Sequence, residues 1–88
     1  MSATNNHINR LTGRINSERR LARAIREGSL NPADILITEG RVWDNRNQRF
    51  RREANVARMI RDGRLNDTEI FPANTRFFNP LTGNFNNA

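Results

Sequence analysis

The chain of 88 residues carries 15 basic residues, all of them arginine, against nine acidic ones, which gives a formal net charge of +6. Its hydrophobic content of 35% allows one small domain with a thin core, and the absence of cysteine excludes disulfides and cysteine-ligated metal sites. No apolar segment has the length of a membrane span or the pattern of a signal peptide, so we expect an intracellular protein that is not secreted and makes no membrane contact.

An internal repeat dominates the sequence. An offset of 35 residues aligns the chain with itself without gaps, and a truncated third copy follows in the same register. The repeat predicts a polar N-terminal arm at 1–7, repeat unit 1 at 8–42, repeat unit 2 at 43–77 and a truncated third unit at 78–88, all within one domain. A duplicated chain presents the same surface twice, which favours a binding role over an active site. The identical pairs include Arg14/Arg49, Glu18/Glu53, Arg23/Arg58, Arg26/Arg61, Gly28/Gly63, Asn31/Asn66 and Ile35/Ile70.

Each unit is expected to begin with a β-hairpin. Apolar residues flank turn-forming centres at 8–15, 42–50 and 77–85. Gly13 and Gly83 supply a left-handed turn position in the first and third of these segments, and asparagine tolerates that conformation in the second.

A helix and a short helical turn are expected after each of the first two hairpins. Ser17 is a suitable cap for a helix over 17–27, whereas the second helix, over 52–62, lacks a capping residue. Asn31 and Asn66 then begin one helical turn each, and an extended segment follows. This succession predicts an α+β fold, a small tandem repeat of β-hairpin plus helix.

The titratable residues form no catalytic pattern. His7 is the only histidine and falls in the N-terminal arm, so we expect no catalytic, cofactor-binding or metal-ligating set. Asp34 and Glu69 are better explained as acids that stabilise the start of a short helix. The sequence therefore predicts neither an enzyme nor a cofactor.

Arginine is the most informative residue type. Its planar guanidinium suits phosphates and carboxylates, so the repeated arginines predict a basic face for nucleic acid or for an acidic protein surface. The competing interpretation is a solvated face that pairs internally with Glu18, Glu27, Glu53 and Asp62. The candidate binding residues are Arg14, Arg19, Arg23, Arg26, Arg41, Arg49, Arg58, Arg61 and Arg76.

Aromatic residues concentrate on the hairpins. Core packing is the favoured role, and base stacking on an exposed hairpin is the alternative. The residues are Trp43, Phe50, Phe77, Phe78 and Phe85, of which the last three are also candidate anchors for the C-terminal tail.

One motif resembles a known family. Residues 79–85 read Asn-Pro-Leu-Thr-Gly-Asn-Phe, similar to the Asn-Pro-x-Thr-Gly-Arg-x-Ile motif of short repeat modules in large nucleocytoplasmic DNA viruses, and residues 11–15 read Leu-Thr-Gly-Arg-Ile. Arg10 replaces the proline of the motif, Asn84 replaces its arginine, and the cysteines of the related two-cysteine adaptor modules are missing. The resemblance implies a viral, non-catalytic attachment or virion module without assigning a ligand.

These features predict a non-enzymatic structural protein of the virion, either a minor capsid component or an internal one, that bridges larger proteins. Capsid proteins, another acidic protein surface and a second copy of the chain are the expected partners. The alternative is a nucleic-acid-binding protein that uses the repeated arginines.

Overall fold

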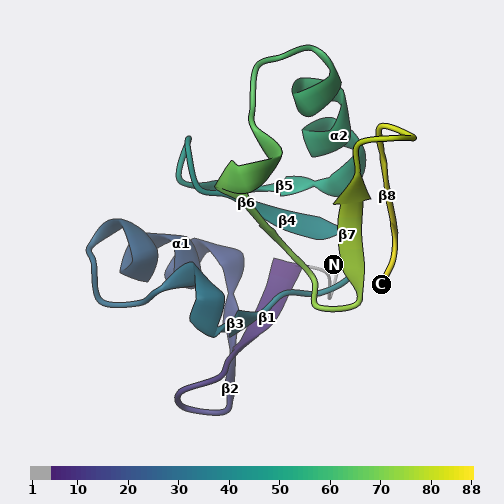
Figure 1. Ribbon diagram of the computed structural model, residues 1–88. Helices are drawn as coiled ribbons and strands as arrows, with labels where there is room; N and C mark the ends of the chain where they lie inside the picture. Colours follow the sequence, from purple (N-terminus) through teal and green to yellow (C-terminus); the bar gives the residue numbers. More distant parts are fainter. Residues whose placement is uncertain (1–4) are drawn as a thin grey trace.

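The computed structural model describes residues 5–88 and confirms the α+β fold, with elements that recur every 35 residues (Figure 1). Each unit begins two residues earlier than the predicted starts at 8, 43 and 78, because the leading strands of the hairpins start at 6, 41 and 76. The first unit contains strands β1 (Asn6–Asn9) and β2 (Arg14–Ser17), helix α1 (Glu18–Arg26), a 3₁₀ turn (Pro32–Asp34) and strand β3 (Ile35–Leu36). The second contains β4 (Arg41–Asp44), β5 (Arg49–Arg52), α2 (Glu53–Arg61), a 3₁₀ turn (Asp67–Glu69) and β6 (Ile70–Pro72). The third consists of β7 (Arg76–Asn79) and β8 (Asn84–Asn87).

The strands form three small antiparallel sheets with one shared register. Their strand orders are β2-β1-β3, β5-β4-β6 and β7-β8. In every hairpin the first residue of the leading strand faces the last residue of its partner: Asn6 faces Ser17, Arg41 faces Arg52 and Arg76 faces Asn87. Residues 35 apart therefore occupy equivalent positions, and their side chains leave the same face of each hairpin.

The helices begin and end where the sequence indicates. The Ser17 hydroxyl accepts a hydrogen bond from the backbone N–H of Arg20 at 3.3 Å, while Arg52 at the equivalent position makes no side-chain cap. Gly28 and Gly63 follow the two helices with φ of +81° and +75°, a conformation that glycine adopts without steric cost.

Each helix is covered by the hairpin of the following unit. The first apolar cluster combines Leu21, Ala22 and Ile25 of α1 with Trp43 and Phe50 of the second hairpin. Trp43 is fully buried, and its ring meets that of Phe50 edge to face at 4.8 Å. Figure 1 shows β4 and β5 lying between α1 and α2. The units are therefore interlocked, because α1 has no complete core without the second hairpin.

The second junction repeats the first with different side chains. Val56, Ala57 and Met59 of α2 pack with Phe85 of the third hairpin, and Phe78 lies against the same cluster. The positions that Trp43 and Phe50 occupy at the first junction are thus filled by Phe78 and Phe85 at the second. Their rings meet edge to face at 5.5 Å.

Polar contacts lock both junctions in the same way. The first residue of each helix accepts two hydrogen bonds from the arginine that begins the next hairpin: Glu18 from Arg41 at 2.7 and 2.8 Å, and Glu53 from Arg76 at 2.9 and 3.1 Å. The last residue of each helix donates to a carbonyl in the next turn, which is Gln48 for Arg26 and Gly83 for Arg61. Paired forks of this kind fix the relative orientation of consecutive units.

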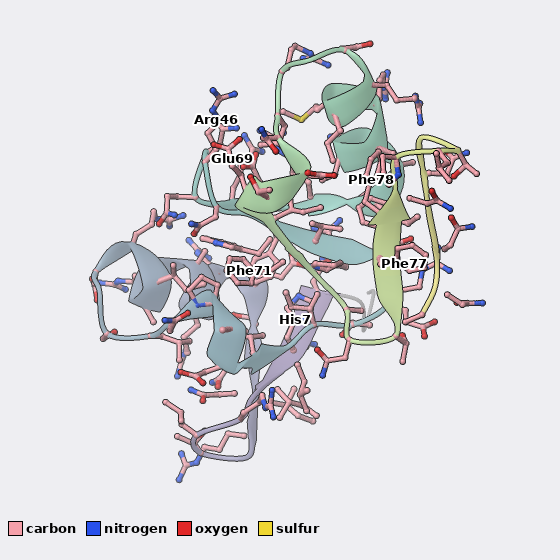
Figure 2. All side chains as sticks on the ribbon, viewed as in Figure 1. His7, Arg46, Glu69, Phe71, Phe77 and Phe78 are labelled. Carbon is pink, nitrogen blue, oxygen red and sulfur yellow. The ribbon has the colours of Figure 1, made fainter. Side chains whose placement is uncertain are left out.

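His7 does not belong to a polar arm, which corrects the sequence-based assignment of 1–7. It lies in β1 with 1% of its surface exposed, at the boundary between the first two units (Figure 2). Its ring stacks on Phe50 at 4.7 Å, Nδ1 accepts from the Thr38 backbone N–H, and Nε2 lies 2.9 Å from a Glu18 carboxylate oxygen. The sequence pattern is misleading here because a polar residue fills a core position. Residues 1–4 of the same arm lie outside the described part of the chain.

The interlocked core predicts unequal effects at two equivalent positions. Phe50→Ala removes a ring that is 9% exposed and should lower the free energy of unfolding by about 3–5 kcal/mol. Ile15→Ala, at the equivalent position of the first hairpin, should change it by less than about 0.5 kcal/mol because Ile15 is 71% exposed. Urea denaturation of both variants measures the difference, and similar losses would contradict the packing described.

The Glu18 ion pair predicts a loss of stability in acid. Burial raises the pKa of Glu18, but hydrogen bonds from His7 and Arg41 outweigh it, so the pKa lies below its ordinary value. A carboxylate with a lowered folded-state pKa stabilises the fold above its ordinary pKa, and this contribution disappears as the pH falls through the folded-state value. Glu18→Gln should therefore lower the free energy of unfolding at neutral pH by roughly 1–3 kcal/mol and flatten its decline below about pH 4.

Glu27→Gln is the matched control for that change. Glu27 caps the end of the same helix, but its side chain is 61% exposed, and among residues 5–88 its ion-pair partner is the exposed Arg23. The denaturant midpoint of this variant, plotted against pH between 2.5 and 7, should coincide with that of the parent protein. A Glu18→Gln curve that also follows the parent would show that the junction ion pair does not stabilise the fold.

Candidate nucleic-acid interface

A concave surface lined by four arginines lies on the exposed side of α1. It has a volume of about 490 Å³ and begins at the cap residue, Ser17. We call it the first groove; its arginines are Arg19, Arg20, Arg23 and Arg26. The apolar side of α1 faces the core, so this helix presents its guanidinium groups to solvent.

A second concave surface occupies the corresponding place on the second unit. It has a volume of about 360 Å³ and lies between β5 and the first half of α2. We call it the second groove; it is lined by Arg41, Arg49, Phe50, Arg51, Arg52, Ala54, Asn55 and Arg58. Four of these residues, 52, 54, 55 and 58, are equivalent to 17, 19, 20 and 23 of the first groove. The two concave surfaces thus lie at overlapping positions of the repeat, and of the four shared positions only 23 and 58 are arginine in both.

Neither groove is lined by an acidic residue. Arg23 approaches Glu27 at 3.3 Å, but both side chains are mostly exposed, and such a pair contributes little. Within residues 5–88, the ion pairs include none to Arg19, Arg20, Arg52 or Arg58. These guanidinium groups therefore carry positive potential that the fold does not neutralise by direct pairing.

Several predicted binding residues instead hold the units together. Arg41 and Arg76 form the junction ion pairs, and hydrogen bonding to Glu18 raises the pKa of Arg41. Arg26 and Arg61 donate to turn carbonyls, although both side chains remain exposed. Internal pairing, the competing interpretation of the arginines, therefore holds for part of the predicted set, mainly for Arg41 and Arg76.

The remaining predicted arginines lie on the surface. Arg14 and Arg49 begin the second strand of their hairpins and are exposed, as are Arg19, Arg23 and Arg58 on the helices. The structure brings Arg19 and Arg23 together in the first groove, and Arg49 and Arg58 in the second. Arg14 and Arg61 line neither groove.

Three groove arginines are not among the residues predicted from the sequence, namely Arg20, Arg51 and Arg52. Their equivalents are Asn55, Asn16 and Ser17, so the offset alignment gives no signal for them. Helical spacing offers one for Arg20, since it lies three residues before Arg23 and on the same side of α1.

Arg51 combines a groove position with a structural role. Its Nε donates to the fully buried Asp44 at 2.8 Å. Burial raises the pKa of Asp44, but hydrogen bonds from Asn47 and Arg51 outweigh that effect and leave the pKa below its ordinary value. Because Arg51 neutralises this carboxylate, it adds less to the charge of the second groove than Arg49 or Arg52 does.

The hairpin aromatics are mostly core residues, as the sequence favours. Trp43, Phe50 and Phe85 are buried, and Phe78 packs partly buried beside Phe85. Phe77 differs, with 43% of its surface exposed on β7 (Figure 2). Phe50 lines the second groove but is used by the core, so the grooves offer guanidinium groups without an exposed aromatic platform for stacked bases.

Other kinds of site find little support in the geometry. Over residues 5–88, no three His, Asp or Glu side chains gather closely enough to hold a metal ion. Neither helix of this part of the chain is long and apolar enough to cross a membrane. No protein-family model, curated protein or solved structure matches the chain. The two grooves and the surfaces of the repeat units are the candidate binding features of residues 5–88.

Proposed function

We propose that this chain is a non-enzymatic protein that binds the phosphate backbone of nucleic acid on its two arginine grooves. The observation that carries the proposal is the recurrence, one unit apart, of a concave surface lined by arginines and free of acidic residues. Guanidinium groups bind phosphate oxygens through charge-assisted and often paired hydrogen bonds.

The interlocked fold supports two-point binding. Glu18–Arg41 pairing and the shared core hold the two units in a fixed relation, so a phosphate chain long enough to span both grooves meets the second at high effective concentration. Contacts to phosphate set position and affinity but do not read bases. The expected binding is sequence-independent and strongly dependent on salt.

The buried acids also favour a binding role over catalysis. Glu18, Glu53 and Asp44 each hold an arginine, and His7 is enclosed between Glu18, Thr38 and Phe50. These are the described side chains whose burial would suit proton transfer, yet each serves to join parts of the fold.

A structural role in a virion, bridging larger proteins, is the second candidate. The proposed location in a virion is based on the resemblance of residues 11–15 and 79–85 to the viral motif. Bridging has support of another kind, since both ends of the repeat stack expose apolar residues: Leu11 and Ile15 at one, Phe77 and Leu81 at the other. Protein that stays monomeric and indifferent to capsid proteins would count against this role.

The groove proposal predicts a specific loss on replacing Arg23 and Arg58 together. These two are the equivalent residues that remain arginine in both grooves. The double alanine variant should bind a random-sequence DNA duplex about tenfold or more weakly, and the slope of log affinity against log salt should fall by about 2. Fluorescence anisotropy across a series of salt concentrations measures both quantities.

Arg10→Ala combined with Arg64→Ala is the matched control. It removes the same charge from exposed positions outside both grooves. Binding that falls equally in the two double variants would mean that net charge alone attracts DNA. No binding of DNA or RNA by the parent protein at low salt would remove the proposal.

A further inference from the structure

The two ends of the stack expose the positions that the interior junctions bury. Alternation along the strands gives each hairpin two faces. We call the face with residues 8 and 15, and their equivalents, the front face, and the face with residue 7 and its equivalents the back face. The first hairpin has no unit before its front face in the described chain, and the third has none behind its back face.

The interior junctions show what covers these faces. At the first, the front face of the second hairpin meets the back face of the first, with Phe50 stacked on His7 at an interplanar angle of 19°. At the second, Phe85 of a front face belongs to the same cluster as Val42 of a back face. Both back-face residues are buried, with 1% exposure for His7 and none for Val42.

Within residues 5–88 the terminal faces lack such cover. Ile15, equivalent to Phe50 and Phe85, is 71% exposed, and Ile8, equivalent to the fully buried Trp43, is 37% exposed. At the other end, Phe77 is equivalent to His7 and Val42 but is 43% exposed. One end therefore presents an uncovered front face and the other an uncovered back face, which are the two halves of the junction that the chain already forms twice.

The strand residues on both terminal faces are uncharged in a protein with 24 charged residues, although Arg61 of α2 donates to Asn84 on the back face of the third hairpin. Beside Ile8 and Ile15 the front face carries Asn6 and Ser17, and the third hairpin has no charged residue from Phe77 to Asn87. Two faces of this composition can meet without electrostatic repulsion despite the net charge of +6. The basic grooves lie elsewhere, on the outer sides of the helices and on β5.

We propose that a second copy of this chain occupies the exposed front face, through head-to-tail docking of its third hairpin. Ile15 of one copy packs on Phe77 of the next, as Phe50 packs on His7 within the chain. The third unit has no helix in the described chain, so Ile8 gains less cover than Trp43 has, and the contact is weaker than the interior junctions. A contact between unlike faces is open-ended and adds further copies as concentration rises.

Sedimentation velocity without nucleic acid tests the docking, because it does not use the arginine grooves. The parent protein should be monomeric when dilute and should form dimers and longer assemblies, with a Kd on the order of 0.1–1 mM. Ile15→Asp blocks one face and Phe77→Asp the other, and each variant alone should remain monomeric. The circular dichroism spectrum of each variant should match that of the parent, and Ile15→Asp should also keep its thermal midpoint because Ile15 is 71% exposed. Phe77 is 43% exposed, so Phe77→Asp should stay folded with a lower thermal midpoint.

The decisive experiment mixes the two blocked variants, Ile15→Asp and Phe77→Asp. Each retains the face that the other has lost, so an equimolar mixture should form one-to-one dimers and nothing larger. Leu81→Asp is the matched control, since Leu81 is 94% exposed in the turn and lies outside both faces; this variant should associate like the parent. A monomeric parent at 1 mM, or association that survives in Phe77→Asp alone, would overturn the proposal, the latter by pointing to pairing of two front faces.

Discussion

The structure depends on the burial of each helix under the hairpin of the following unit. An isolated unit of this size has little apolar surface to bury, and α1 offers only a narrow stripe of Leu21, Ala22 and Ile25. Trp43 and Phe50 supply the large rings that this stripe needs. The repeat is therefore a coupled system, in which the energy of one unit includes the interface with the next.

Polar contacts give this coupling its geometry. Rings and aliphatic side chains tolerate sliding, whereas a two-pronged arginine–carboxylate contact has one favourable orientation. Glu18 with Arg41, and Glu53 with Arg76, place that contact at the start of both helices. Some of the repeated arginines, which the sequence predicts to bind a partner, are therefore structural. The charge available for a partner comes from neighbours such as Arg19 and Arg52, which have no such pairing within residues 5–88.

The fold could be predicted from the sequence because its signals are local. Ser17, Gly28 and Asn31 mark a helix start, a helix end and a second turn, and the offset carries the same interpretation to the second unit. It was harder to predict which residues belong to the core and which to the candidate site, because this depends on which hairpin covers which helix. His7 occupies a core position through hydrogen bonds to Glu18 and Thr38 that lie far away in sequence. Arg51 is neutralised by Asp44 only once β4 and β5 are paired.

The dependence of each helix on the next hairpin also sets an order for folding during synthesis. While the ribosome has delivered only the first 40 residues, α1 has no ring to cover its stripe, so the nascent first unit is incomplete. Emergence of Phe50 completes that unit, and α2, which is synthesised next, stays uncovered until Phe85 emerges. Each helix is therefore buried only after the hairpin of the next unit has been synthesised. A stall in translation after residue 75 leaves the apolar side of α2 accessible to chaperones and proteases.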